Sequence, residues 1–135
     1  MAEIVEFESV HEFDLLKIGI AIDVTLSSGS HSIDLEARVD TGSSFCIFER
    51  YYAERLDLET ETGIPIMIGT ATGSFRAFAH EITLTVLGIE LYSTVYFAES
   101  ELFDRNVLGR NGWLNKVKLG LIEPEGKLYL SHYRT

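Results

Sequence analysis

The chain has 135 residues, 46% of them hydrophobic, and a formal net charge of -10 at pH 7. This length suits one domain, residues 1–135, which can bury a core without disulfides and is too short for two ordinary domains. The acidic balance excludes nucleic acid and anionic membranes as expected partners, because binding to either rests on clustered Lys and Arg.

The N-terminal segment "MAEIVEFESVHEFD" carries acids where a signal peptide needs a basic start. No apolar stretch in the chain is long enough to span a bilayer. Cys46 is the single cysteine, and it cannot form a disulfide within the chain, which suits a reducing compartment. We therefore expect a soluble, cytoplasmic protein.

The first predicted elements are two strands. Apolar residues alternate with period two from Ile18 to Leu26 and again from Ile33 to Val39, and "SSGS" between them has turn composition. This pattern predicts a β-hairpin whose second strand leads directly into Asp40.

Further along the chain, "FERYYAERLDLE" at 48–59 predicts one short helix. "IPIMIG" at 64–69 and "FRAFAHEITLTVL" at 75–87 flank the small-residue segment "TATGS" and predict a second, longer hairpin. Its returning strand has one apolar face that includes Phe78, His80 and Ile82.

The last third of the chain predicts more strands. "ELYSTVYFA" at 90–98 is an apolar run, and "KVKLGLI" at 116–122 and "KLYLSHY" at 127–133 bracket the turn "EPEG". Many short strands, one or two short helices and regular turns predict an all-β, barrel-like domain.

The segment "VDTGSS", residues 39–44, follows the first hairpin directly. Its residue types are turn formers, so it could be a simple loop. However, it lies between a strand of alternating core residues and the apolar run "FCIF", and loops at strand ends are where rigid scaffolds present catalytic groups. Gly42 would let the backbone approach the Asp40 carboxylate and donate hydrogen bonds to it.

Three segments together resemble the retropepsin-like aspartic proteases, which include retroviral proteases and related domains of some cellular proteins. "VDTGSS" is similar to the apolar-Asp-Thr-Gly-Ser/Ala signature, "MIGTATGSF" at 67–75 to the flap, and "NVLGRNGWL" at 106–114 to the segment that follows the flap strands. They occur in the family's order and spacing, over about Lys17 to Tyr133. The resemblance implies a closed, β-barrel-like retropepsin (acid protease) fold with a flap hairpin.

The resemblance also implies an aspartic endopeptidase with Asp40, Thr41 and Gly42 as its catalytic residues. Peptide hydrolysis of this kind needs one carboxylate to activate water and a second, protonated carboxyl to polarise the carbonyl. The chain contains one Asp-Thr-Gly, and neither Asp34 nor Asp104 has the Thr-Gly context. An active enzyme would therefore be a symmetric homodimer with Asp40 of each subunit at the two-fold axis. The resemblance implies that Thr41 bonds to the partner's loop in such a dimer.

In this family, a peptide or protein substrate lies extended between the two acids and the flaps and pairs through its backbone. A tip of small residues could close over it and exclude water, although an ordinary hairpin turn fits "TATGS" equally well. We expect substrates of apolar leaning, with Ile47 as one pocket wall. The other expected substrate-binding residues, each apolar one equally compatible with plain core, are Ile68, Gly69, Thr70, Ala71, Thr72, Gly73, Ser74, Phe75, Val107 and Leu108.

The chain departs from the family's pattern at two positions. Viral members pair the arginine that corresponds to Arg110 with an acid four residues past the catalytic one, where this chain has Ser44, so Arg110 would need another carboxylate. Asn111 stands where cellular members often have Asp, a change compatible with capping a short helix over "GWLNK". Trp113 is most simply a core residue.

Other catalytic chemistries have no support in the sequence. The histidines are scattered without ligand spacing, so we expect no metal site and no cofactor. There is neither a serine-nucleophile elbow nor a phosphate-binding Walker loop. The alternative to a protease is a catalytically inactive retropepsin-fold dimerisation or peptide-binding module, because a misplaced flap or a weak dimer would abolish activity with the motif untouched.

Overall fold

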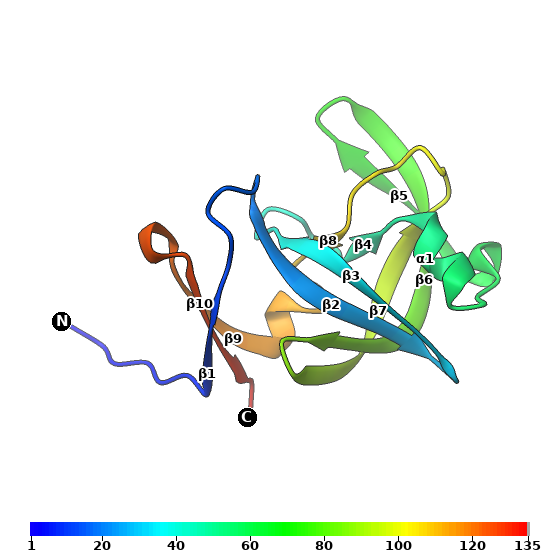
Figure 1. Cartoon of the computed structure of the whole chain (residues 1–135). Helices are drawn as coiled ribbons and strands as arrows, with labels where there is room; N and C mark the ends of the chain where they lie inside the picture. The colour runs from blue at the N-terminus through cyan, green and yellow to red at the C-terminus, as the bar shows by residue number, and fades with distance from the viewer. Residues whose placement is uncertain (135) are drawn as a thin grey trace.

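The computed structural model describes residues 1–134, and strands dominate it (Figure 1). One α-helix, α1 (Arg50–Arg55), and the short 3₁₀ helices η1 (Thr60–Thr62), η2 (Leu114–Lys116) and η3 (Glu123–Glu125) join them. The strands are β1 (Ser9–Glu12), β2 (Ile20–Ser28), β3 (His31–Val39), β4 (Ile47–Phe48), β5 (Ile64–Thr70), β6 (Gly73–Val86), β7 (Ile89–Ala98), β8 (Val107–Leu108), β9 (Val117–Ile122) and β10 (Lys127–His132).

The main sheet closes on itself. Its strand order is β2-β3-β8-β4-β7-β6-β5, and β2 also pairs with β6, so that six strands form a ring with β5 outside it. The closing pairs run from Val24 opposite Val86 to Ser27 opposite Thr83. The predicted all-β, closed barrel-like fold is confirmed.

The predicted hairpins are present. β2 and β3 pair from Ile20 opposite Val39 to Ser28 opposite His31, and Gly29 in the turn has φ = 57°, a conformation that favours glycine. One residue differs from the prediction: Ile18 lies before the strand begins and is 80% exposed. Ile18 therefore fits the alternating pattern in the sequence without being buried in the sheet.

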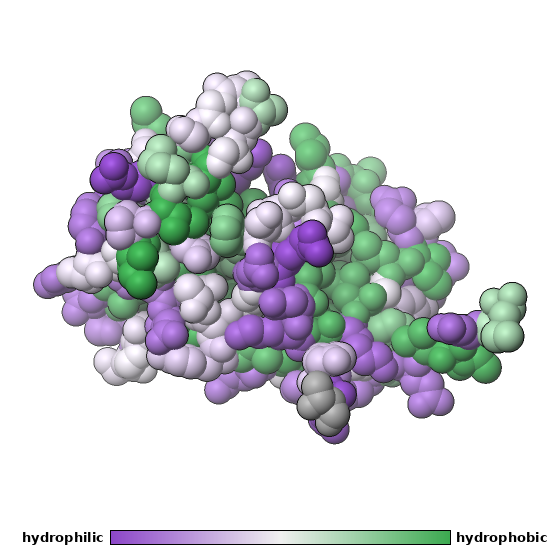
Figure 2. All heavy atoms as spheres, turned by 180° about the vertical axis from the view of Figure 1, so that it is seen from behind, coloured by the Kyte–Doolittle hydropathy of each residue, from purple (hydrophilic) through white to green (hydrophobic). Residues whose placement is uncertain are grey.

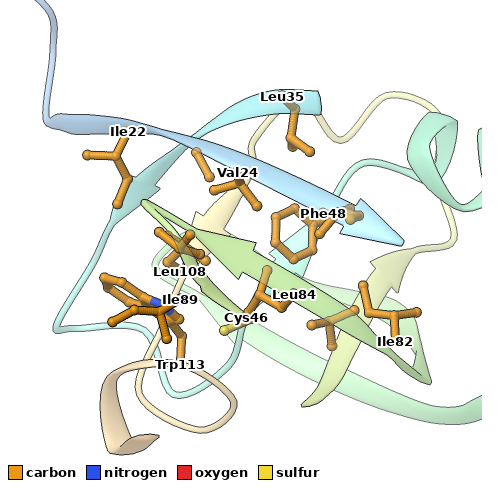
Figure 3. Packing of buried hydrophobic residues seen from close by; sticks show 14 of the residues in the cluster. Ile22, Val24, Leu35, Cys46, Phe48, Ile82, Leu84, Ile89, Leu108 and Trp113 are labelled. Carbon is orange, nitrogen blue, oxygen red and sulfur yellow. The ribbon is translucent and has the colours of Figure 1, made fainter. Parts of the chain in front are cut away.

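The core fills the interior of the ring. Figure 3 shows side chains converging there from several strands, among them Ile22, Phe48 and Leu84, and from the turn after β8, which carries Trp113. Trp113 is fully buried, as predicted. Burial of a large apolar side chain contributes roughly 1.5–3 kcal/mol relative to exposure, so this cluster provides a rigid base for the loops above it.

Cys46 belongs to the same core and is fully buried. Burial raises the pKa of its thiol to about 11, although a weak contact with the Gly109 carbonyl acts in the opposite direction. A thiol that stays protonated is a poor nucleophile, so Cys46 acts as a packing residue.

A smaller apolar cluster connects the β5–β6 hairpin to the barrel. Its buried members are Ile47, Ile68 and Ala77. Phe75 and Phe103 pack on this cluster, with their ring centroids 4.7 Å apart. The loop 99–106 consequently rises beside the hairpin, as Figure 1 shows in yellow and green.

The chain termini form a second sheet with strand order β1-β10-β9. β1 pairs with β10 from Ser9 opposite Leu130 to Glu12 opposite Lys127, so the fold includes a strand that precedes the predicted core boundary at Lys17. This sheet lies at one side of the molecule, away from the projecting β5–β6 hairpin (Figure 1). Among residues 1–134, no helix has the length and apolar character needed to cross a membrane.

Candidate active site

The loop after β3 positions Asp40. Its backbone N–H donates to the Leu108 carbonyl at 3.0 Å, and its own carbonyl accepts from Ser43 N–H at 3.2 Å. The Gly42 N–H donates to the carboxylate Oδ1 at 2.9 Å. The side chain is thus oriented by the backbone of its own loop, while the residue as a whole remains exposed in the single chain.

Glycine at position 42 is explained by a close approach. A Cβ added there would lie 3.2 Å from Asp40 Oδ1, which is tighter than most carbon contacts, so a side chain would displace the carboxylate or the loop. Gly42 does not have a positive φ. Proximity to the acid, and not backbone conformation, is the reason for glycine here.

The segment after β8 is hydrogen-bonded to the backbone of the Asp40 loop. Arg110 N–H donates to the Ser43 carbonyl and Asn111 N–H to the Ser44 carbonyl, both at 2.9 Å. A Cβ on Gly109 would lie 2.1 Å from the Phe45 carbonyl oxygen. The two segments therefore cross so closely that no other residue fits at position 109.

Two expectations for this segment are corrected or completed. Asn111 does not cap a helix: its Nδ2 donates to the Ser44 carbonyl at 2.8 Å, and Asn115 Oδ1 instead accepts from Gly112 N–H at 3.2 Å. Arg110 is exposed and, within residues 1–134, makes no ion pair. Within residues 1–134, the structure therefore gives Arg110 no carboxylate partner.

A pocket of about 180 Å³ lies between Asp40 and the β5–β6 hairpin. Asp40 is the one acidic residue that lines it. The other lining residues, from the loops, the hairpin, β4 and β8, are Ser43, Ile47, Ile68, Gly69, Thr70, Phe75, Phe103, Arg105 and Val107.

The pocket brings together many of the residues singled out by sequence. Asp40, Ile47 and Val107 line it, together with Ile68, Gly69, Thr70 and Phe75 of the hairpin. Sequence reasoning did not name Ser43, Phe103 or Arg105 as pocket residues. The last two lie in the irregular loop 99–106, which has no periodicity that marks which side chains face inward.

The remaining sequence candidates lie elsewhere. Leu108 is fully buried and belongs to the main core, where Figure 3 shows it, so it is not a wall of this pocket. Its neighbour Val107 faces the opposite way because successive side chains of a strand alternate. Thr41 and the hairpin-tip residues, Ala71, Thr72, Gly73 and Ser74, are exposed and do not line the pocket.

The β5–β6 hairpin beside the pocket has a tip of small residues and a more hydrophobic stem. Thr70 pairs with Gly73 at its end, and Thr70 Oγ1 donates to the Gly73 carbonyl at 3.1 Å. Figure 2 shows pale, small side chains at the tip and hydrophobic side chains lower on this side of the molecule. Ile64 and Met67 on the stem are exposed.

The fold of the chain is similar to that of a solved retroviral protease. The solved structure of the EIAV protease in complex with the inhibitor HBY-793 matches it with a TM-score of 0.55 and 19% sequence identity, over 70% of this chain and 85% of that one. No protein-family model and no curated protein sequence matches the chain.

Proposed function

We propose that the protein is an aspartic endopeptidase that acts as a homodimer. The observation that carries the proposal is Asp40, oriented by the Gly42 N–H and opening into the pocket beneath the β5–β6 hairpin. A carboxylate in this position can accept a proton from a water molecule that attacks a peptide carbonyl. Asp40 is the general base in this proposal, Gly42 orients its carboxylate, and Thr41 would bond to the partner's loop in the dimer.

The second carboxyl comes from another copy of the chain. Hydrolysis needs a protonated acid to polarise the scissile carbonyl, and two acids held close together share one proton because both cannot ionise cheaply. Asp40 is the single acid of its pocket in the described chain. A two-fold axis beside Asp40 supplies the partner without any further residue.

Exposed apolar side chains beside Asp40 support such an association. Ile20 pairs with Val39, so the residues just before β2 lie next to the Asp40 loop. Leu16 and Ile18 in this segment are 95% and 80% exposed. Large exposed apolar groups close together are typical of protein–protein contacts.

The β5–β6 hairpin is the flap in this proposal. An extended peptide would lie between the hairpin and Asp40 and pair with backbone groups near Gly69 and Thr70. Closure of the tip would exclude water from the reacting bond. The similarity of the fold to that of the EIAV protease supports this assignment.

The test is cleavage of a diverse peptide library by the wild type and by Asp40→Asn, from acid to neutral pH. We expect wild-type cleavage that a statine-type transition-state mimic blocks, and a loss of at least about 10³-fold in turnover in the variant. If neither protein cleaves any peptide although both form dimers in solution, the proposal is contradicted and the inactive peptide-binding module is favoured.

A further inference from the structure

A second cavity, of about 350 Å³, lies beside the pocket at Asp40, and Arg105 lines both. Chain geometry explains the proximity: Arg38 lies two residues before Asp40, and its backbone N–H donates to the Asn106 carbonyl at 2.9 Å. The lining residues of the second cavity are Lys17, Ile18, Ala21, Glu36, Ala37, Arg38, Asp104, Arg105 and Asn106.

The residues that line this cavity include more basic than acidic side chains, whereas the protein as a whole is acidic. Lys17 and Glu36 neutralise each other through an ion pair at 2.6 Å. Asp104 also lines the cavity, but within residues 1–134 neither Arg38 nor Arg105 has a carboxylate within 4.0 Å. A chain with net charge -10 thus places two guanidinium groups without a carboxylate partner in this cavity, and one of them, Arg105, also lines the pocket of Asp40.

The guanidinium of Arg105 also has a defined support. Its Cζ lies 6.0 Å from the centroid of the Phe103 ring, within the range of a cation–π contact. Phe103 in turn packs against Phe75 of the hairpin. Arg105 is therefore held where the hairpin, the loop 99–106 and the Asp40 pocket meet, a position that a peptide between the hairpin and Asp40 would contact.

We propose that the two cavities form one peptide-binding groove in which Arg105 and Arg38 bind a Glu or Asp side chain of the substrate, beside the bond that lies over Asp40. Arginine suits this role because its planar fork can donate two parallel hydrogen bonds to one carboxylate. The inference deepens the proposed function and rests on it. It replaces a purely apolar substrate preference with one that includes an acidic residue.

Binding of uncleavable peptides tests the inference without relying on turnover. Three statine-containing peptides would be compared that differ only in carrying Glu, Gln or Lys at the positions flanking the statine, at about pH 6, where Glu is ionised. Each would be titrated by fluorescence anisotropy against the wild type, Arg105→Gln and Arg55→Gln. Arg55 is an exposed residue of α1 that does not line either cavity, so its variant matches the change in net charge.

The wild type is expected to bind the Glu peptide about tenfold more tightly than the Gln peptide and the Lys peptide most weakly. The preference for Glu should fall to about twofold or less in Arg105→Gln and persist in Arg55→Gln. Equal binding of the Glu and Gln peptides by the wild type would overturn the inference and leave the aspartic site standing. Absence of binding by all three peptides, together with absence of Asp40-dependent cleavage, would overturn both.

Discussion

At the residue scale, the orientation of Asp40 depends on how closely the backbone approaches its carboxylate. The Gly42 N–H is 2.9 Å from Asp40 Oδ1, a charge-assisted hydrogen bond that fixes one oxygen. In the proposed dimer, the other oxygen would be available to water and to the partner carboxyl. A small displacement of this group matters because catalysis depends on alignment of the reacting atoms.

Gly42→Ala should therefore impair turnover more than stability. The added Cβ would meet Asp40 Oδ1 at 3.2 Å, so the carboxylate has to shift by a few tenths of an ångström, and we expect turnover to fall by about tenfold to a hundredfold. Position 42 is exposed, so the melting temperature should change by about 2 °C or less. Wild-type turnover in this variant would refute the role assigned to the close approach.

The sequence predicted individual residues only where a motif or a period marked them. The Asp-Thr-Gly motif located Asp40, and the small-residue hairpin located Gly69 and Thr70 of the pocket. Leu108 was assigned to the pocket because analogy does not tell which of two adjacent strand residues faces inward. Arg105 was missed because nothing in an irregular loop distinguishes an arginine beside a pocket from a solvated one.

At the element scale, the site rests on the crossing between the Asp40 loop and the segment after β8. β8 pairs in parallel with β3 and antiparallel with β4, so this short strand ties both sides of the Asp40 loop together. Gly109 is at the tightest point, with its α-carbon against the Phe45 carbonyl. Any side chain at position 109 would meet backbone atoms, which cannot move aside by changing rotamer.

Gly109→Ala should consequently destabilise the fold. The Cβ would lie 2.1 Å from the Phe45 carbonyl oxygen, and relief requires separating β8 from the Asp40 loop, at a cost of about 3 kcal/mol or more in unfolding free energy. Gly69→Ala is the matched control, because its Cβ meets nothing within 4 Å. Urea denaturation monitored by Trp113 fluorescence would measure both, and equal midpoints for the two variants would refute the prediction.

Elements were predictable from sequence in proportion to their length. The nine-residue strands β2 and β3 carry a clear period of two, and turn residues mark the ends of the β5–β6 and β9–β10 hairpins. The two-residue strands β4 and β8 show no period, although they connect the two halves of the ring. Their pairing is a tertiary event, set by long-range contacts that a local pattern does not encode.

At the scale of the whole molecule, closure of the ring and the separate terminal sheet leave the Asp40 loop facing outward. The strand order, including the β2–β6 pairing, was not derivable from local patterns, whereas the resemblance to the retropepsins did imply a closed barrel. A single chain places one acidic residue, the exposed Asp40, in the pocket beside the β5–β6 hairpin. Catalysis by the proposed aspartic endopeptidase would therefore need two chains to complete one site.

Mixing wild type with Asp40→Asn tests whether one catalytic site takes Asp40 from two copies of the chain. Chains would be exchanged at concentrations where light scattering shows dimers, and cleavage would be measured per wild-type chain. If two Asp40 residues form the site, activity per wild-type chain falls with the wild-type fraction, to about one half in an equal mixture and about one tenth with a ninefold excess of variant. Activity per wild-type chain that stays constant across the mixtures would contradict a catalytic site shared between two copies.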